Sequence, residues 1–192
     1  MSHMPPAGDA QETRRRLVEA AYQEFAAYGI AGARVDRVAA TAGVNKALIY
    51  FHFSNKDGLF AAVFEQLVGQ ALSEAPMDAT NLPEYAGRLF DAGQAHPDAL
   101  RLAAWHRLER SPDQAPLKAV LDANQSKIDA IAEAQAAGHV TTRFTAAEVL
   151  ALVLTIANMW SVLTPELHLS APQDPATRRA LVVAALTTLL AP

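Results

Sequence analysis

The chain has 192 residues, of which 51% are hydrophobic and 19% charged, a balance that supports a packed core in one or two domains and excludes global disorder. It has no cysteine, which excludes disulfides and thiolate metal sites and fits a reducing cytoplasm. The net charge of −4 argues against a nucleic-acid binder, but residues 11–57 hold seven Lys and Arg against five Asp and Glu, so the N-terminal part is mildly basic on an acidic chain.

The N-terminal segment is expected to be a short tail followed by one helix. Met1-Ser2-His3-Met4 is typical of a cloning scar, and the Pro- and Gly-containing residues after it favour a flexible tail. The helix is expected to run to about Tyr28, with Phe25 and Tyr28 on one apolar face, and to end at Gly29. The arginines at positions 14–16, in its first turns, are expected to be mostly solvated.

A helix, a tight turn and a second helix are predicted between residues 35 and 53. Apolar residues recur at helical spacing in the first helix, at Val35, Val38, Ala39 and Ala42. Gly43 interrupts this pattern where a residue with positive φ would end the helix, and Asn45 is placed to cap the next one. The second helix carries three polar side chains among small and apolar residues, namely Lys46, Tyr50 and His52. This pattern is the helix-turn-helix, whose second helix fits the major groove of DNA.

Proline, glycine and capping residues divide the rest of the chain into further helices. We expect these helices to begin near Lys56, Pro83, Leu100, Leu117, Ala146 and Pro175. Ser54 with Asp57, and Thr145 with Glu148, have the spacing of capping boxes. The last two helices are apolar nearly all round, so they must be buried on several sides, in part against a partner. There is no strand pattern and no run of about 18 apolar residues, which predicts an all-helical chain without a membrane span.

The helix-turn-helix segment resembles that of the TetR family of bacterial repressors. The family's signature is matched at Val38-Ala39, Ala42-Gly43-Val44, Tyr50, Phe53 and Lys56, and, with Gly29 and Leu59, the match covers residues 12–64. The resemblance implies an all-α fold of about nine helices, with a three-helix DNA-binding head over residues 11–55. It also implies a helical body for ligand binding and dimerisation over residues 56–192, which leaves residues 1–10 as scar and tail.

Nine residues are expected to meet DNA, namely Arg34, Asn45, Lys46, Ala47, Leu48, Tyr50, Phe51, His52 and Lys56. Lys46 is suited to guanine O6 and N7 or to a phosphate, and Asn45 to capping its helix or to reaching a base. Tyr50, His52 and Lys56 match the backbone contacts that the resemblance implies.

Some of these positions depart from the family pattern. Ala47 and Leu48 offer only apolar contact where the family often has Gly and Thr or Ser, so the weight in DNA recognition shifts to Lys46, Arg34 and Phe51 nearby. Arg34 stands where the family often has a Thr that caps the helix. A guanidinium has no acceptor and cannot cap, but it can meet a phosphate.

Two further sets of residues are expected in the body. A ligand pocket is predicted among polar and aromatic residues at or beside apolar stripes: Trp105, His106, Asn124, Gln135, Asn158 and Trp160. The alternative for each of them is a packed or hydrogen-bonded position in the core. A four-helix dimer interface, implied by the resemblance, would use Val149, Val153, Ile156, Leu181, Leu186 and Leu189.

No catalytic motif is found in the sequence. A nucleophile elbow, a Gly-rich phosphate loop and a pair of Glu-x-x-His motifs are all missing. The sequence therefore predicts no enzyme, no cofactor and no metal site.

The predicted function is that of a cytoplasmic, homodimeric transcription regulator, a repressor that binds a palindromic operator on double-stranded DNA. The resemblance implies that a small apolar or amphipathic ligand releases it. Two alternatives stay open. One is a DNA binder that needs no ligand or is controlled by a protein partner, and the other is a helical interaction module that has lost DNA binding.

Overall fold

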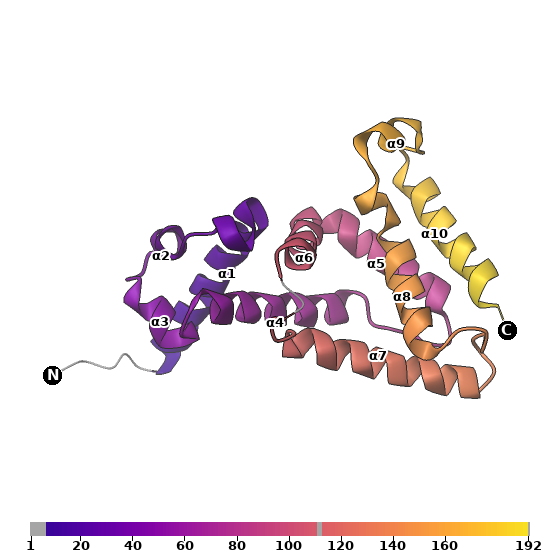
Figure 1. Ribbon diagram of the computed structural model, residues 1–192, viewed down its shortest axis with the longest axis horizontal. Helices are drawn as coiled ribbons and strands as arrows, with labels where there is room; N and C mark the ends of the chain where they lie inside the picture. Colours follow the sequence, from indigo (N-terminus) through magenta and orange to yellow (C-terminus); the bar gives the residue numbers. More distant parts are fainter. Residues whose placement is uncertain (1–6, 111–112, 192) are drawn as a thin grey trace. The chain divides into compact units, whose positions relative to one another are not determined.

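The computed structural model describes residues 7–110 and 113–191, and all regular structure in these two ranges is helical (Figure 1). Its elements are α1 (Ala7–Gly32), α2 (Val35–Ala42), α3 (Ala47–Phe53), α4 (Lys56–Glu74), α5 (Leu82–Ala95), α6 (Pro97–Glu109), α7 (Lys118–Ala136), α8 (Ala146–Ala157), the 3-10 helix η1 (Met159–Val162), α9 (Pro165–Ser170) and α10 (Pro175–Leu190). The predicted all-α fold is confirmed. The tail expected over residues 1–10 lies partly outside the described residues, and α1 already begins at Ala7.

The helices pack as two compact units. Unit 1 contains the described residues up to Leu67 and those from Asp98 to Leu117, that is α1 to α3, the first part of α4, and nearly all of α6. Unit 2 contains residues 68–97 and the described residues from Lys118 onward. A division between residues 55 and 56 therefore does not follow the packing, because α6 and the first turns of α4 belong to the same compact unit as the N-terminal helices.

Aromatic and aliphatic side chains of α1, α3 and α4 form the core of unit 1. Phe25 of α1 and Phe60 of α4 are buried, and their rings meet edge to face at 5.1 Å. Ile49 of α3 is fully buried. Tyr28, expected on the same apolar face as Phe25, is instead 53% exposed, and the Arg37 guanidinium packs on its ring at 4.2 Å.

Unit 2 is organised around α5, α8 and α10, which pack against one another, while α7 packs against α8 (Figure 1). Its buried core includes Tyr85, Phe90, Ile131, Val149, Val153, Val182 and Leu186. This packing explains why α8 and α10 are apolar on more than one face. Val149, Val153 and Leu186 were expected to face a second copy, but each is 0% exposed and leaves no surface for a partner.

Most of the expected helix caps are formed. Thr145 and Glu148 make the predicted capping box at the start of α8. The box expected between Ser54 and Asp57 is not formed, since Ser54 ends α3 with a positive φ of 63°. Asn55 replaces it, and its Oδ1 accepts the Gly58 N–H at 2.8 Å at the start of α4.

The segment between α8 and α10 contains two short helices that the sequence does not predict. α8 ends at Ala157, η1 follows, and the short helix α9 begins after Thr164, whose side chain accepts the Leu167 N–H. A helix of six residues completes fewer than two turns, so apolar periodicity cannot reveal it.

Gly29 interrupts α1 with φ 72° and ψ 179°, as the sequence led us to expect, although helical hydrogen bonding resumes and continues to Gly32. Two side chains of α6 are held at this break. The indole Nε1 of Trp105 donates to the Ala26 carbonyl at 3.3 Å, and Glu109 accepts the Ala31 N–H at 2.8 Å. A Cβ on Gly29 would clash with Glu109 Oε1 and lie 3.1 Å from the Trp105 ring, and the positive φ itself favours glycine.

Gly29→Ala should destabilise unit 1 because it combines a strained φ with a clash against α6. We expect a loss of about 1–3 kcal/mol in the free energy of unfolding, measured by urea denaturation followed by circular dichroism.

Two other glycines serve as controls that separate the effect of the strained φ from the effect of the clash with α6. Gly138 has φ 78° with nothing within 4 Å of a built Cβ, so Gly138→Ala reports strain alone. Gly69, with an equally open Cβ position inside α4, should gain about 0.5–1 kcal/mol as alanine. A Gly29→Ala loss no greater than that of Gly138→Ala would contradict the proposed contact with α6.

Candidate nucleic-acid interface

The turn between α2 and α3 is closed by backbone hydrogen bonds. Gly43 adopts the left-handed conformation with φ 64°, as predicted. Its N–H donates to the Ala40 carbonyl at 3.1 Å, and the Val44 N–H donates to Ala39 at 3.0 Å, the pair of bonds that defines a Schellman motif. Arg16 of α1 donates to the Ala42 carbonyl and so ties this end of α2 to α1.

The start of α3 is capped by Asn45. Its Oδ1 accepts the Ala47 N–H at 2.8 Å, so this oxygen serves the helix rather than a base. Lys46 follows immediately, and its Nζ lies 2.7 Å from Oδ1 of Asp36 in the first turn of α2. Hydrogen bonding to Lys46, followed by the charges of Lys46 and Arg34, holds the pKa of Asp36 below its ordinary value.

α3 presents one face to the core and another to solvent. Phe53 is buried together with Ile49. Tyr50 is 48% exposed and Phe51 is 74% exposed, which is unusual for aromatic side chains in a folded unit. Among the other residues expected to meet DNA, Ala47 is exposed, while Leu48 and His52 are half-buried. The exposed face of α3 can therefore contact a partner that presents a groove.

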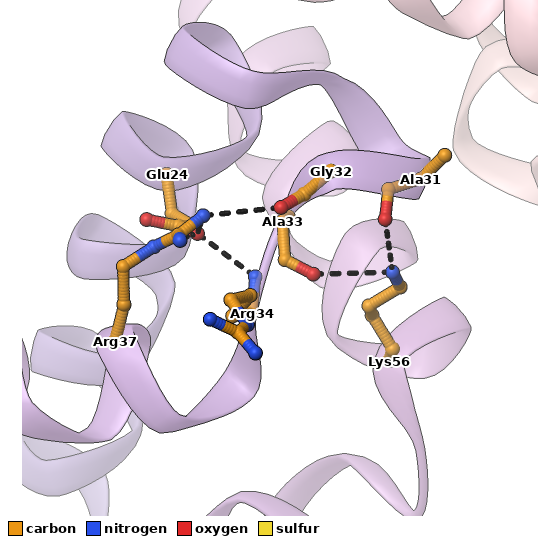
Figure 2. Close-up of polar contacts among 7 residues, drawn as sticks. All are labelled: Glu24, Ala31, Gly32, Ala33, Arg34, Arg37 and Lys56. Atoms are coloured by element: carbon orange, nitrogen blue, oxygen red, sulfur yellow. Dashed lines mark hydrogen bonds and ion pairs between the residues drawn. The ribbon is translucent and has the colours of Figure 1, made fainter.

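The link between α1 and α2 is held by charged side chains from three helices (Figure 2). Glu24 of α1 is only 8% exposed, and its Oε1 accepts the Arg34 backbone N–H and the Arg37 Nε–H, both at 2.8 Å. The Arg37 guanidinium also donates to the Gly32 carbonyl at 3.0 Å. On the other side of the link, Lys56 Nζ donates to the carbonyls of residues 31 and 33, at 3.3 and 3.2 Å.

Glu24 is ionised at neutral pH despite its burial. Burial raises the pKa of its carboxyl, but hydrogen bonds from Arg37 and from the Arg34 backbone, with the charges of both arginines, outweigh this and lower the pKa overall. The buried anion therefore fixes where α2 begins. The Arg34 side chain caps nothing, as predicted, and extends from this fixed point into solvent (Figure 2).

Lys56 has a structural role that the sequence did not reveal. A lysine in the first turn of a helix opposes the helix dipole, and the resemblance implies a DNA-backbone contact for Lys56. In the structure its ammonium instead binds two carbonyls of the α1–α2 link, which anchors α4 to that link (Figure 2). Each arginine at positions 14–16 also has a protein partner: Arg14 pairs with Glu65, Arg15 with Glu12, and Arg16 with the end of α2.

The six residues expected in a ligand pocket are divided between the two units. Trp105 and His106 belong to unit 1, where the His106 ring packs against Phe64 of α4 at 4.7 Å. The other four lie in unit 2, and three of them bind backbone carbonyls, Gln135 to Thr141 and Phe144, Asn158 to Leu154, and Trp160 to Arg178. Asn124 of α7 is half-buried.

A shallow groove runs between α8 and α10 in unit 2. It is lined by Arg143, Ile156, Ala184, Ala185, Thr188 and Leu189. Ile156 and Leu189 are two of the residues predicted for a dimer interface, and a third, Leu181 of α10, is 46% exposed.

Two features are absent from the described ranges, residues 7–110 and 113–191. No helix there is long and apolar enough to cross a membrane. Nor do they contain any cluster of three or more His, Cys, Asp or Glu side chains arranged to hold a metal ion.

Sequence reasoning missed Glu24, Arg37 and Asp36. Glu24 had a recognisable signal, since it lies seven residues after Leu17 and so falls on the apolar stripe of α1. An acidic residue on a buried stripe needs a cationic partner, which here is Arg37. Asp36 gave no such signal, because its pairing with Lys46 depends on the angle between α2 and α3.

Two family models match the chain. One is described as bacterial regulatory proteins of the tetR family and matches residues 17–63, and the other, described as "Tetracyclin repressor-like, C-terminal domain", matches residues 81–187. Together they cover unit 1 from α1 to α4 and most of unit 2.

Individual relatives agree with these models. The HTH-type transcriptional repressor SCO4008 of Streptomyces coelicolor is 38% identical over 162 residues, which are 84% of this chain and 84% of that protein. The crystal structure of the transcriptional regulator SCO4942 from the same organism is also 38% identical, with a TM-score of 0.78 over 93% of this chain and 98% of that one. NalD, the secondary repressor of the MexAB-OprM multidrug efflux pump in Pseudomonas aeruginosa, is 19% identical with a TM-score of 0.65 over 95% of this chain and 98% of its own, and shows the fold alone.

Glu24→Gln should destabilise unit 1, because the neutral amide keeps the shape but loses the charge that binds Arg37. We expect a loss of about 2–3 kcal/mol at pH 7 in the free energy of unfolding, measured by urea denaturation. Since the folded pKa of Glu24 is lowered, its stabilisation is complete above the unfolded pKa of about 4.3 and disappears as the pH falls through the folded value.

The difference between wild type and Glu24→Gln should therefore shrink in acid. Glu19→Gln, an exposed position on the same helix, is the matched control and should change little at either pH. Equal stability losses for Glu24→Gln at pH 7 and at pH 3 would contradict an ionised, buried Glu24.

Proposed function

The chain belongs to the TetR family of DNA-binding transcriptional regulators, and on that premise we propose that it is a cytoplasmic homodimeric repressor of a palindromic operator. The observation that carries the proposal is α3, a short helix with two buried anchors and two exposed aromatic side chains on a head held in place by charged contacts. The repressor SCO4008 is a relative over most of its length, which supports repression as the mode of action.

In the proposed complex α3 enters the major groove. Lys46, Tyr50 and Phe51 would face the duplex, with Arg34 beside a phosphate at the start of α2. Two heads would occupy successive major grooves about 34–36 Å apart, so the half-site spacing reflects the two-fold symmetry of the protein. Phosphate contacts would supply much of the affinity, which should then fall steeply with salt.

The groove between α8 and α10 is proposed as the dimer interface. Its lining combines apolar Ile156 and Leu189 with the small residues Ala184 and Ala185, which allow helices of a second copy to approach closely. Exposed Leu181 on α10 would extend this apolar surface. A two-fold axis would place the same residues on both sides.

We further propose that a small apolar or amphipathic effector in the helical body controls DNA binding. Such a ligand acts only through different affinities for two states, typically worth about 1–3 kcal/mol. The chain passes between the units within α4, at the start of α6 and at the start of α7, so these connections would carry the change. A ligand-independent repressor is the alternative, and it is favoured if no compound alters operator affinity.

The proposal is tested by selecting random duplex DNA with the purified full chain and measuring the affinity of the enriched sequence at several salt concentrations. A palindromic sequence, bound with a steep salt dependence, is the expected result. Failure to enrich any sequence, with weak binding to every duplex, would contradict a sequence-specific repressor.

Single substitutions on α3 should then divide into two classes. Tyr50→Phe should weaken binding to the operator and to unrelated DNA alike, because a phosphate contact carries no sequence information. Lys46→Ala should cost more on the operator, by about tenfold, if its ammonium meets a base. Equal losses on both DNAs for Lys46→Ala would overturn that assignment. Both affinities are measured by fluorescence anisotropy.

Leu181→Asp should weaken the dimer at least about tenfold, because it buries an unpaired charge in an apolar interface. Leu169→Asp is the matched control, since Leu169 is 87% exposed on α9 and does not line the groove. Sedimentation velocity over a concentration series measures both. A dimer that survives Leu181→Asp as well as it survives Leu169→Asp would move the interface elsewhere.

A further inference from the structure

Asp36 and Lys46 form an ion pair across the helix-turn-helix. The Lys46 Nζ lies 2.7 Å from Asp36 Oδ1, and the two side chains are 44% and 70% exposed. The pair therefore joins the first turn of α2 to the start of α3 on the outside of unit 1, where solvent and a bound duplex can both reach it.

Lys46 is the cation of this segment that can change partner. Residues 35–53 contain only two Lys or Arg side chains, Arg37 and Lys46. Arg37 is committed to the buried Glu24 and to the Gly32 carbonyl. An exposed ion pair is weak and easily exchanged, so Lys46 can leave Asp36 when a better partner arrives.

We propose that Asp36 is a specificity-determining residue, which competes with DNA phosphate for Lys46. This inference rests on the proposed function. On unrelated DNA, Lys46 can gain a phosphate only by leaving Asp36, an anion that then has only the charge of Arg34 near it and lies beside the phosphates of the duplex. The exchange brings little net affinity, because one ion pair replaces another and a like-charge contact is added.

The exchange is more favourable on the operator, because a guanine edge offers Lys46 two hydrogen-bond acceptors. Lys46 can donate to guanine O6 and N7 together, which unrelated sequences do not place within its reach. The gain at the base outweighs the loss of Asp36. Asp36 thus lowers affinity for DNA in general more than affinity for the operator, and raises the ratio between them.

A purely structural role for Asp36 makes different predictions. A carboxylate beside the start of α3 could simply stabilise that helix end, or fasten α2 to α3. Its removal would then lower the melting temperature and weaken binding to both DNAs. A selectivity role predicts the opposite sign on unrelated DNA.

The test compares wild type with Asp36→Asn, in the full chain, on the selected operator and on an unrelated duplex of equal length. Asp36→Asn should tighten binding to unrelated DNA about two- to fivefold and tighten operator binding less. The slope of log affinity against log salt on unrelated DNA should steepen by about 0.9, as expected for one additional phosphate contact.

Two controls make the result specific. Glu19→Gln makes the same change of net charge at an exposed position of α1 and should leave the affinity ratio unchanged. In a Lys46→Ala background, Asp36→Asn should tighten binding less, because there is no ammonium to release and only the like-charge repulsion is removed.

Several outcomes would overturn the proposal. An unchanged affinity ratio and salt slope would do so, as would equal tightening in the Lys46→Ala background. A lower melting temperature with weaker binding to both DNAs would assign the structural role instead. Absence of DNA binding by the wild-type chain would refute the proposed function itself, and is recognised because it appears before any substitution is made.

Discussion

The buried carboxylate of Glu24 is the contact on which the DNA-binding unit depends. It holds the Arg34 N–H and the Arg37 guanidinium, and so fixes the start of α2 against α1. A buried charge that loses its partner is strongly destabilising, which makes this contact hard to rearrange. Because α2 leads through the Gly43 turn into α3, the orientation of the helix proposed to enter the groove follows from it.

Most cations of unit 1 are used to build the head rather than to attract DNA. Arg16 and Lys56 bind backbone carbonyls, while Arg37 binds a buried acid. Because these cations are bound within the protein, the helix-turn-helix has few positive charges left for DNA, in keeping with the net charge of −4 of the chain. Affinity for DNA would then depend on a few cations that can change partner, chiefly Lys46. When these cations are few, a single acid such as Asp36 can influence the selectivity for the operator over unrelated DNA.

The sequence predicted what is local and periodic, and failed where contacts depend on tertiary packing. The all-α fold, the Gly43 turn and the Thr145 capping box each follow from residues a few positions apart. The role of Lys56 does not, because its partners lie more than twenty residues earlier in the chain. The buried state of Val149 was also missed, since apolar periodicity cannot distinguish a helix covered by its own chain from one covered by a partner.

The most direct test of this account is amide hydrogen exchange in the link between α1 and α2, measured by NMR on the free protein. The Ala31 and Arg34 amides donate to Glu109 and Glu24, so both should exchange slowly, at rates close to those of the buried turns of α1. Exchange of these two amides at the rate of an unstructured peptide would contradict a fixed link, and with it the idea that buried charges orient α2 and α3 for DNA.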